Sequence, residues 1–160
     1  MLVFRLLLVT AAVVMADICR DPVCEFTFVI RRTSSMTYRG SSGTLYNVAL
    51  NGTRLQQDDD AAVGYFINPS DVITLDGFTR DLIVVNDIFP GPTIEVMEGA
   101  QVVVRVINDL LTEGITLHWH GMHVINTPWM DGTAYVTQCP VPAQHSFTYR
   151  FTAFPHGTHW

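Results

Sequence analysis

The strongest constraint on the fold is the lack of helical periodicity, since no stretch of a dozen residues repeats apolar positions every three to four residues. Instead, short apolar or alternating runs end at turns that contain Gly or Pro. Many short strands joined by tight turns are typical of an antiparallel β-sandwich or barrel. We expect strands over residues 25–31, 72–75, 78–85, 93–97, 101–107 and 145–151, with a hairpin turn at Asp76-Gly77.

The composition is that of a folded protein with a substantial core. Of the 160 residues, 48% are hydrophobic and 15% are charged, which argues against global disorder. A chain of this length is one ordinary domain or part of a larger one. The net charge is −6 and basic residues form no cluster, which argues against a nucleic-acid partner.

The N-terminus has the features of a secretory signal peptide over residues 1–16. Arg5 is followed by a short apolar run that ends at the small residue Ala16, a plausible cleavage point. The run is shorter than the roughly 20 apolar residues that span a bilayer. The alternative is a buried N-terminal strand. We therefore expect a secreted protein from an oxidising compartment.

Two regions are expected after the signal peptide. Residues 17–70 form an N-terminal segment with one strand and a long loop region, because Ser, Thr, Gly and Asn dominate after residue 33. Within it, Asn51-Gly-Thr53 is an acceptor pattern for N-glycosylation. Residues 71–160 carry the clearer strand pattern and are expected to form the main domain.

The chain has three cysteines, Cys19, Cys24 and Cys139. In a secreted protein an odd number implies a free thiol, an intermolecular bridge or a missing partner. None of them lies in a Cys-x-x-Cys pair, so neither a redox motif nor a zinc ribbon is supported.

The sequence Ile115-Thr-Leu-His-Trp-His-Gly121 predicts half of a metal site. On a strand, side chains two apart point to the same face, so His118 and His120 converge while Leu117 and Trp119 face the opposite, packed side. Imidazole nitrogens are common metal ligands. The alternative is that the two histidines only make local hydrogen bonds.

Six short motifs, which serve as landmarks, follow one another in a fixed order between about residue 73 and residue 160, and together they are far more specific for a family than any one of them. They are Pro90-Gly-Pro92, Glu98-Gly99, His118-Trp-His-Gly121, Met130-Asp-Gly132, Thr137-Gln-Cys-Pro140 and Gly157-Thr-His-Trp160. In this order they resemble the first cupredoxin (plastocyanin-like) domain of a multicopper oxidase, with the laccase-like animal branch nearest. The resemblance implies an all-β, cupredoxin-like Greek-key β-sandwich, here the incomplete first domain of a multi-domain oxidase and an N-terminal fragment.

The resemblance also implies a copper-dependent oxidase. Such enzymes couple one-electron oxidation of phenols, aromatic amines or metal ions to four-electron reduction of dioxygen to water. By resemblance, His118 would bind the type 2 copper of a trinuclear cluster and His120 one of the type 3 pair. The remaining ligands and the type 1 copper would lie outside this chain, in further cupredoxin domains that are its partners, so the fragment alone is expected to be inactive.

By the same resemblance, Asp131 would be an acid beside the cluster that orients ligands and relays protons. Its alternative role is that of a turn residue in an Asp-Gly pair. Cys139 does not suit a blue-copper site, because no His follows closely. A disulfide to a later domain suits it better.

Two other functions remain open. One is a secreted, non-catalytic copper-binding β module. The other is a zinc hydrolase, which would need a third ligand and a general base that the sequence does not offer. The other histidines match no ligand position: His123, His145, His156 and His159.

Overall fold

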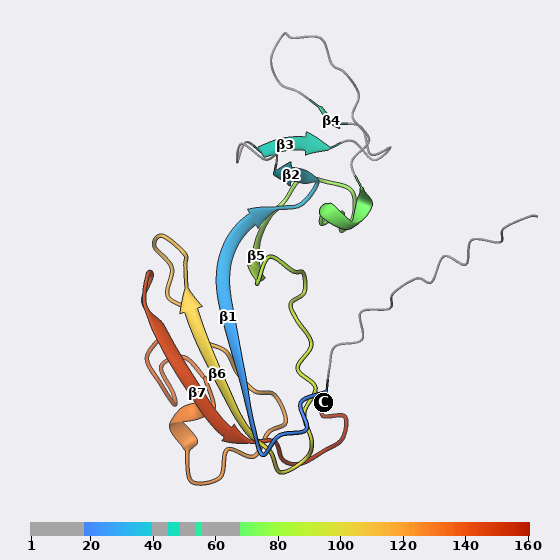
Figure 1. The fold of residues 1–160 in the computed structure, drawn as a ribbon. Coiled ribbons are helices and arrows are strands. Elements are labelled where there is room, and N and C mark those ends of the chain that lie inside the picture. Colours follow the sequence, from blue (N-terminus) through green and yellow to red (C-terminus); the bar gives the residue numbers. More distant parts are fainter. Residues whose placement is uncertain (1–17, 40–44, 49–53, 56–67) are drawn as a thin grey trace, which may run out of the picture.

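The computed structural model describes residues 18–39, 45–48, 54–55 and 68–160, whose regular secondary structure is almost entirely β. Its main sheet has four strands in the order β5-β1-β6-β7 (Figure 1), with bounds β1 (Val23–Ser34), β5 (Asp81–Val85), β6 (Gln101–Asn108) and β7 (Ser146–Thr152). The helical content of the described residues is two short 3-10 turns, η1 (Pro69–Asp71) and η2 (Pro128–Met130). The expected all-β class is confirmed.

Strand β1 pairs in opposite senses with its two neighbours. It runs antiparallel to β5 and parallel to β6, whereas β6 and β7 are antiparallel. The expectation of a purely antiparallel arrangement is therefore wrong for the β1–β6 pair. No hairpin turn joins these two strands, so local sequence does not set their relative direction. Strand β1 precedes residue 71, yet it lies in the same sheet as β5, β6 and β7.

The core lies on one face of this sheet. Val102, Val104 and Val106 of β6 are buried, and the residues between them are more exposed, as the two-residue period of a strand requires. Tyr149 and Phe151 of β7 are also buried. Phe147, Tyr149 and Phe151 all belong to one apolar cluster, to which β1 adds Phe28 and Ile30 and the following loop adds Leu110. Burial of such a side chain is worth about 1.5–3 kcal/mol, so this face holds the sheet to the segments that cover it.

A second, antiparallel sheet lies beyond the end of β1 (Figure 1). It consists of β2 (Thr37–Arg39), β3 (Leu45–Val48) and β4 (Arg54–Leu55), in a region where the sequence predicts a long loop. The connection between β1 and β2 is anchored by the buried Ser35. Its Oγ donates to the carbonyl oxygen of Phe78 (2.7 Å) and accepts from the amide of Arg80 (2.9 Å).

Two expected strands do not form regular strands. Residues 72–75 lead into a tight turn in which the amide of Gly77 donates to the carbonyl of Thr74 (2.8 Å), so the turn is present without the hairpin. In residues 93–97 only Val96 forms a bridge, parallel to Cys19. Both segments have the residue pattern of a strand. A regular strand also needs a neighbouring strand to pair with, and the residue pattern does not determine that.

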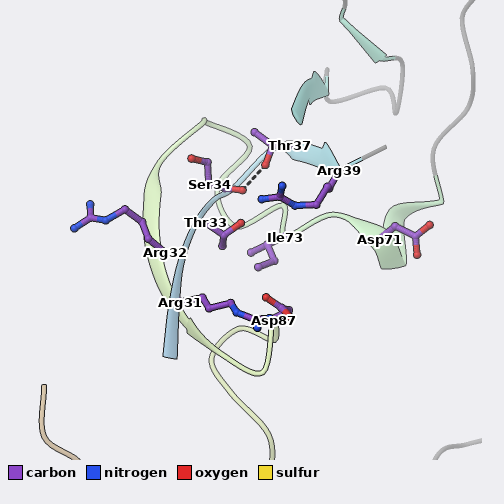
Figure 2. A pocket seen from close by; sticks show the side chains of 9 residues that line it. All are labelled: Arg31, Arg32, Thr33, Ser34, Thr37, Arg39, Asp71, Ile73 and Asp87. Atoms are coloured by element: carbon purple, nitrogen blue, oxygen red, sulfur yellow. Dashed lines mark hydrogen bonds and ion pairs between the residues drawn. The ribbon is translucent and has the colours of Figure 1, made fainter. Parts of the chain in front are cut away.

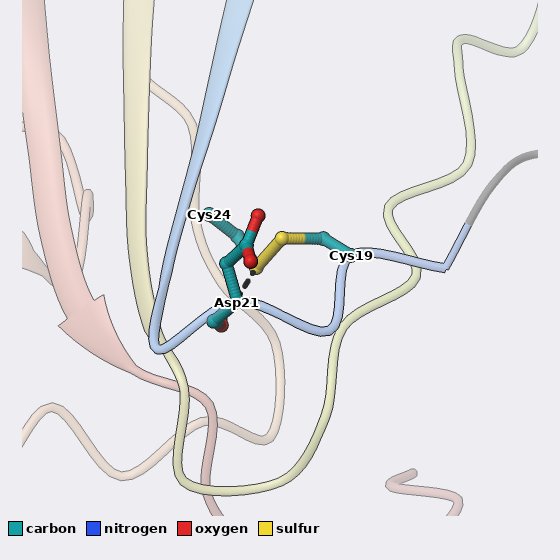
Figure 3. The surroundings of a disulfide bond; sticks show 3 residues. All are labelled: Cys19, Asp21 and Cys24. Carbon is teal, nitrogen blue, oxygen red and sulfur yellow. Dashed lines mark hydrogen bonds between the residues drawn. A yellow bond between two sulfur atoms is a disulfide. The ribbon is translucent and has the colours of Figure 1, made fainter.

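Cys19 and Cys24 form a disulfide that holds the first described residues against the start of β1 (Figure 3). The amide of Cys19 also donates to the carbonyl of Glu95 (2.9 Å), next to the Val96 bridge. Cys139 is free and exposed. The odd cysteine count is thus one local bridge and one thiol.

Two expectations concern residues outside the described ranges, the signal peptide at 1–16 and the glycosylation site at Asn51. Among the residues that the structure describes, none of the helical turns has the length or the apolar character needed to cross a membrane.

Candidate metal centre

The segment that carries His118 and His120 is extended but is not a strand. It is anchored at Ile115, which exchanges two backbone hydrogen bonds with Val141 (2.8 and 3.1 Å), and it ends in a turn at His120-Gly121. The alternation expected of a strand nevertheless holds. Leu117 and Trp119 pack against the core, whereas His118 and His120 are exposed.

The two imidazoles lie side by side. Their ring centroids are 5.9 Å apart and the rings meet edge to face, at an interplanar angle of 88°. Placement of both rings on one exposed side agrees with the geometry that the sequence predicts.

His118 is held by Asp131, which follows η2. Its Nδ1 lies 2.7 Å from the carbonyl oxygen of Asp131 and 3.4 Å from Oδ1 of the same residue. A carbonyl oxygen can only accept, so Nδ1 carries the hydrogen and the neutral ring keeps its lone pair on Nε2. Asp131 also serves as the cap of η2, since its amide donates to the carbonyl of Pro128 (3.2 Å). It therefore combines a turn role with contact to His118.

Gly132 brings the two segments together. Its φ is +80°, and a Cβ at this position would lie 1.6 Å from the carbonyl oxygen of Leu117. Only a residue without a side chain permits this approach. The Asp131–Gly132 backbone is thereby pressed against the backbone of Leu117 and His118.

Tyr149 and Thr133 support the site, and the sequence analysis did not identify either as a site residue. The buried hydroxyl of Tyr149 accepts from the amide of Leu117 (3.0 Å), and burial raises the pKa of this phenol. Thr133 Oγ1 donates to Asp131 Oδ2 (2.8 Å). The only sequence signal for Thr133 is its position directly after Asp131-Gly132. Tyr149 carries no signal beyond its place on the apolar face of β7.

An apolar pocket of about 600 Å³ lies beside Trp119, the residue between the two histidines. Trp119, Met122, Val96 and Phe151 are among its lining residues. The indole Nε1 of Trp119 is buried and has no hydrogen-bond partner among the described residues. The aromatic ring packs against Phe151 (centroids 4.8 Å apart) and Tyr149 (5.3 Å), so the structure gives Trp119 a core role.

A polar cavity of about 450 Å³ lies elsewhere, where β1 meets the second sheet (Figure 2). Arg31 lines it and donates to Asp87 (3.0 Å) and Asp109 (2.9 Å). The hydrogen bond to Asp109, and then the charge of Asp87, raise the pKa of the Arg31 guanidinium. Carboxylates at bonding distance therefore compensate the charge of Arg31.

A family model for multicopper oxidases matches residues 67–160, more than half of the chain. The chain belongs to the multicopper oxidase family. Members of this family are oxidoreductases that use copper, dioxygen and a reducing substrate. The resemblance inferred from the six landmarks is therefore confirmed at the level of the family.

Several relatives are similar to this multicopper oxidase chain. Laccase-1 of Cryptococcus neoformans var. neoformans is 49% identical over 86 residues, which cover 53% of this chain and 14% of that protein. L-ascorbate oxidase of Brassica rapa subsp. pekinensis is 49% identical over 76 residues, which cover 48% of this chain and 13% of that protein. The chain thus spans about one seventh of the length of these relatives.

Solved structures share the fold. The multicopper oxidase mgLAC has a TM-score of 0.53 at 29% identity, over 82% of this chain and 29% of that one. Fet3p, a multicopper oxidase that functions in iron import, has a TM-score of 0.55 at 21% identity, over 82% of this chain and 18% of that one. The cupredoxin-like fold class is therefore confirmed.

The site residues fit copper by the chemistry of their donors. Imidazole suits copper, and a metal-binding histidine usually donates its other ring N–H to a carbonyl or carboxylate, as Nδ1 of His118 does to Asp131. Within the described residues, no group of three or more His, Cys, Asp or Glu side chains is placed to hold a metal ion. A metal ion bound by these two histidines would need further ligands.

The four other histidines differ in their contacts. His123 packs against the ring of Phe154, and His145 Nδ1 lies 2.8 Å from the carbonyl of Ala143. His156 forms an ion pair with Glu98 (2.8 Å). His159 lies against Gly121, where a Cβ would come within 2.4 Å of its ring.

Proposed function

We propose that this chain contributes His118 and His120 to the trinuclear copper site of a laccase-like oxidase. The reaction would couple one-electron oxidation of phenols, aromatic amines or metal ions to reduction of dioxygen to water. The observation that carries the proposal is the pair of exposed imidazoles, 5.9 Å apart, on a segment whose other side chains are packed in the core. Copper bound there would supply electron transfer to dioxygen.

Each residue has a distinct proposed role. His118 binds the type 2 copper through Nε2, because Nδ1 is occupied by the Asp131 carbonyl. His120 binds one copper of the type 3 pair. The Asp131 carboxylate orients His118 and holds a proton for dioxygen reduction, which consumes protons. The type 1 copper and the remaining ligands are proposed to come from other cupredoxin domains.

Two single substitutions in the full-length protein test the assignment. His118→Ala should weaken the type 2 paramagnetic resonance signal and largely spare the near-ultraviolet absorption of the bridged pair. His120→Ala should disturb that absorption first. His145→Ala is a matched control, because the ring of His145 bonds to the neighbouring Ala143 carbonyl, and it should change neither spectrum. Identical losses in His118→Ala and His120→Ala would reject the assignment to different coppers.

The second candidate is a secreted, non-catalytic copper-binding β module. It is favoured by the absence, within the described residues, of a cluster of three metal-ligating side chains. Oxygen consumption by the copper-loaded full-length protein with a phenol, an aromatic amine, ascorbate or ferrous iron separates the two candidates. An oxidase consumes oxygen with at least one of them, whereas the module binds copper and consumes none.

We also propose that the protein is secreted, with residues 1–16 as signal peptide and 17–70 as N-terminal segment. Residues 71–160 are then the first cupredoxin domain, and strand β1 of the N-terminal segment is part of its main sheet.

Asn51 is proposed to carry a glycan, and the exposed Cys139 is proposed to pair with a cysteine of a later domain. Glycosidase treatment of protein from a secretory host should increase its gel mobility, whereas Asn51→Gln should be insensitive. A wild-type protein that does not shift contradicts the glycan.

A further inference from the structure

Thr133 connects the loop after η2 to the side chain of Asp131. Its Oγ1 donates to Asp131 Oδ2 (2.8 Å), and the other carboxylate oxygen, Oδ1, lies 3.4 Å from His118 Nδ1. One oxygen is thus held by Thr133 while the other is turned toward the imidazole. We infer that Thr133 is a positioning residue, whose hydroxyl orients Asp131 so that His118 adopts the tautomer with hydrogen on Nδ1. The inference rests on the proposed function only for its link to copper.

The backbone of Thr133 is anchored independently of its hydroxyl. Its amide donates to Thr137 Oγ1 (2.9 Å), and its carbonyl accepts from the amides of Val136 (3.2 Å) and Thr137 (3.0 Å). Valine has the shape of threonine without the hydroxyl. Thr133→Val therefore preserves the loop contacts and removes the hydrogen bond to Asp131.

The tautomer decides which nitrogen of His118 can bind a metal. A neutral imidazole carries its hydrogen on one nitrogen, and the partner of that nitrogen determines which one. The Asp131 carbonyl and Oδ1 both face Nδ1; the carbonyl oxygen can only accept, and so can a carboxylate oxygen that carries no hydrogen. The Asp131 side chain is 27% exposed, so a carboxylate released by Thr133 can turn toward water. Only the carbonyl would then favour hydrogen on Nδ1, and a hydrogen on Nε2 blocks metal binding there.

Nitrogen-15 NMR of the histidine rings in the whole, metal-free chain tests this directly. Spectra are recorded well above the ordinary histidine pKa of about 6.5, where the two tautomers of a neutral imidazole are distinguished by their ring nitrogen shifts. The wild type should show hydrogen predominantly on Nδ1 of His118. Thr133→Val should lower the ratio of the two tautomers about threefold or more, and Thr133→Ser should restore it, because serine keeps the donor. An unchanged ratio in Thr133→Val overturns the inference.

Two further variants keep the test decisive. Thr112→Val is the matched control, because Thr112 also donates to a carboxylate, that of Glu113 (3.0 Å), and contacts neither Asp131 nor His118. It should leave the tautomer unchanged. Asp131→Ala should reproduce the Thr133→Val shift while it keeps the carbonyl, and the double variant should add nothing. Should Thr133→Val fail to fold, Asp131→Ala alone decides, and an unchanged tautomer there overturns the inference.

Addition of Cu(II) to the same samples separates the inference from the proposed function. Paramagnetic broadening of the His118 ring signals reports copper at this residue. Copper affinity should fall about tenfold in Thr133→Val, the lower end of what loss of such supporting contacts costs. If Cu(II) broadens neither His118 nor His120, the result counts against copper ligation by this pair, while the tautomer result stands. If Cu(II) binds equally in wild type and Thr133→Val with the same tautomer, Thr133 has no positioning role.

Discussion

At the scale of single residues, the closest approach near the candidate copper site is between Gly132 and Leu117. A methyl group on residue 132 would lie 1.6 Å from the Leu117 carbonyl oxygen, so Gly132→Ala must push the backbone of His118 away. We predict a loss of unfolding free energy of more than about 3 kcal/mol, which is severe for overpacking. Urea unfolding of the chain measures it.

Gly99→Ala is the control, because Gly99 has almost the same φ, +86°, and nothing within 4 Å of its Cβ position. It should cost only the penalty of a left-handed backbone, about 1–2 kcal/mol. Equal losses in the two variants would show that backbone conformation, and not the contact with Leu117, makes glycine necessary at position 132.

At the scale of elements, one hydrogen bond connects strand β7 to the segment that carries His118 and His120. The hydroxyl of Tyr149, fully buried, accepts from the amide of Leu117. Tyr149→Phe should leave this amide without a partner and lower the unfolding free energy by about 1–3 kcal/mol. Amide hydrogen exchange at Leu117 should accelerate as well. Tyr135→Phe, at a residue that is 85% exposed, should change neither quantity. Unaltered exchange at Leu117 in Tyr149→Phe contradicts the role.

The same elements show what the sequence could predict. Strands β6 and β7 could be predicted from the sequence, and both are present. Their alternation of apolar and polar residues depends only on which side chains face the core. The parallel pairing of β1 with β6 was not readable, because it depends on contacts between residues about 78 positions apart that no local turn dictates.

The candidate site divides in the same way. Convergence of His118 and His120 follows from residue spacing, which even an extended segment outside a ladder obeys. The contacts of Asp131, Thr133 and Tyr149 with this segment depend on how the loop after η2 and strand β7 fold back, which spacing does not encode.

A surface ion pair between Glu98 and His156 joins the turn before β6 to the segment after β7. The hydrogen bond with Glu98 raises the pKa of His156, and the bond with His156 lowers that of Glu98. The contribution of His156 to stability is therefore complete below the ordinary histidine pKa, about 6.5, and is lost as pH rises through the raised value. The contribution of Glu98 is complete above its ordinary pKa and is lost as pH falls through the lowered one.

We predict from this pair that Glu98→Gln returns the pKa of His156 toward its ordinary value. An NMR titration of the His156 ring measures the change, with the ring of His145, which has a carbonyl partner, as internal reference. The shift should shrink at high salt, since both side chains are exposed. An identical titration in wild type and Glu98→Gln would mean that the pair does not form in solution.

At the scale of the whole molecule, the main sheet has a packed apolar core, whereas the candidate site consists of few metal-ligating groups. The four-stranded sheet with its apolar cluster presents two imidazoles and one carboxylate at one place. Four-electron reduction of dioxygen needs several metal ions and a source of electrons. The described residues bring together no group of three metal-ligating side chains.

The 160-residue chain, loaded with copper, should therefore consume no oxygen in the presence of a phenol, an aromatic diamine or ferrous iron. Copper held at His118 and His120 alone would lack the neighbouring ions that share the four electrons of dioxygen reduction to water. Oxygen-electrode measurements on the purified chain test this, and His118→Ala/His120→Ala is the background for adventitious copper. Oxygen consumption above that background would show that this chain supplies more of a catalytic copper site than its two neighbouring imidazoles.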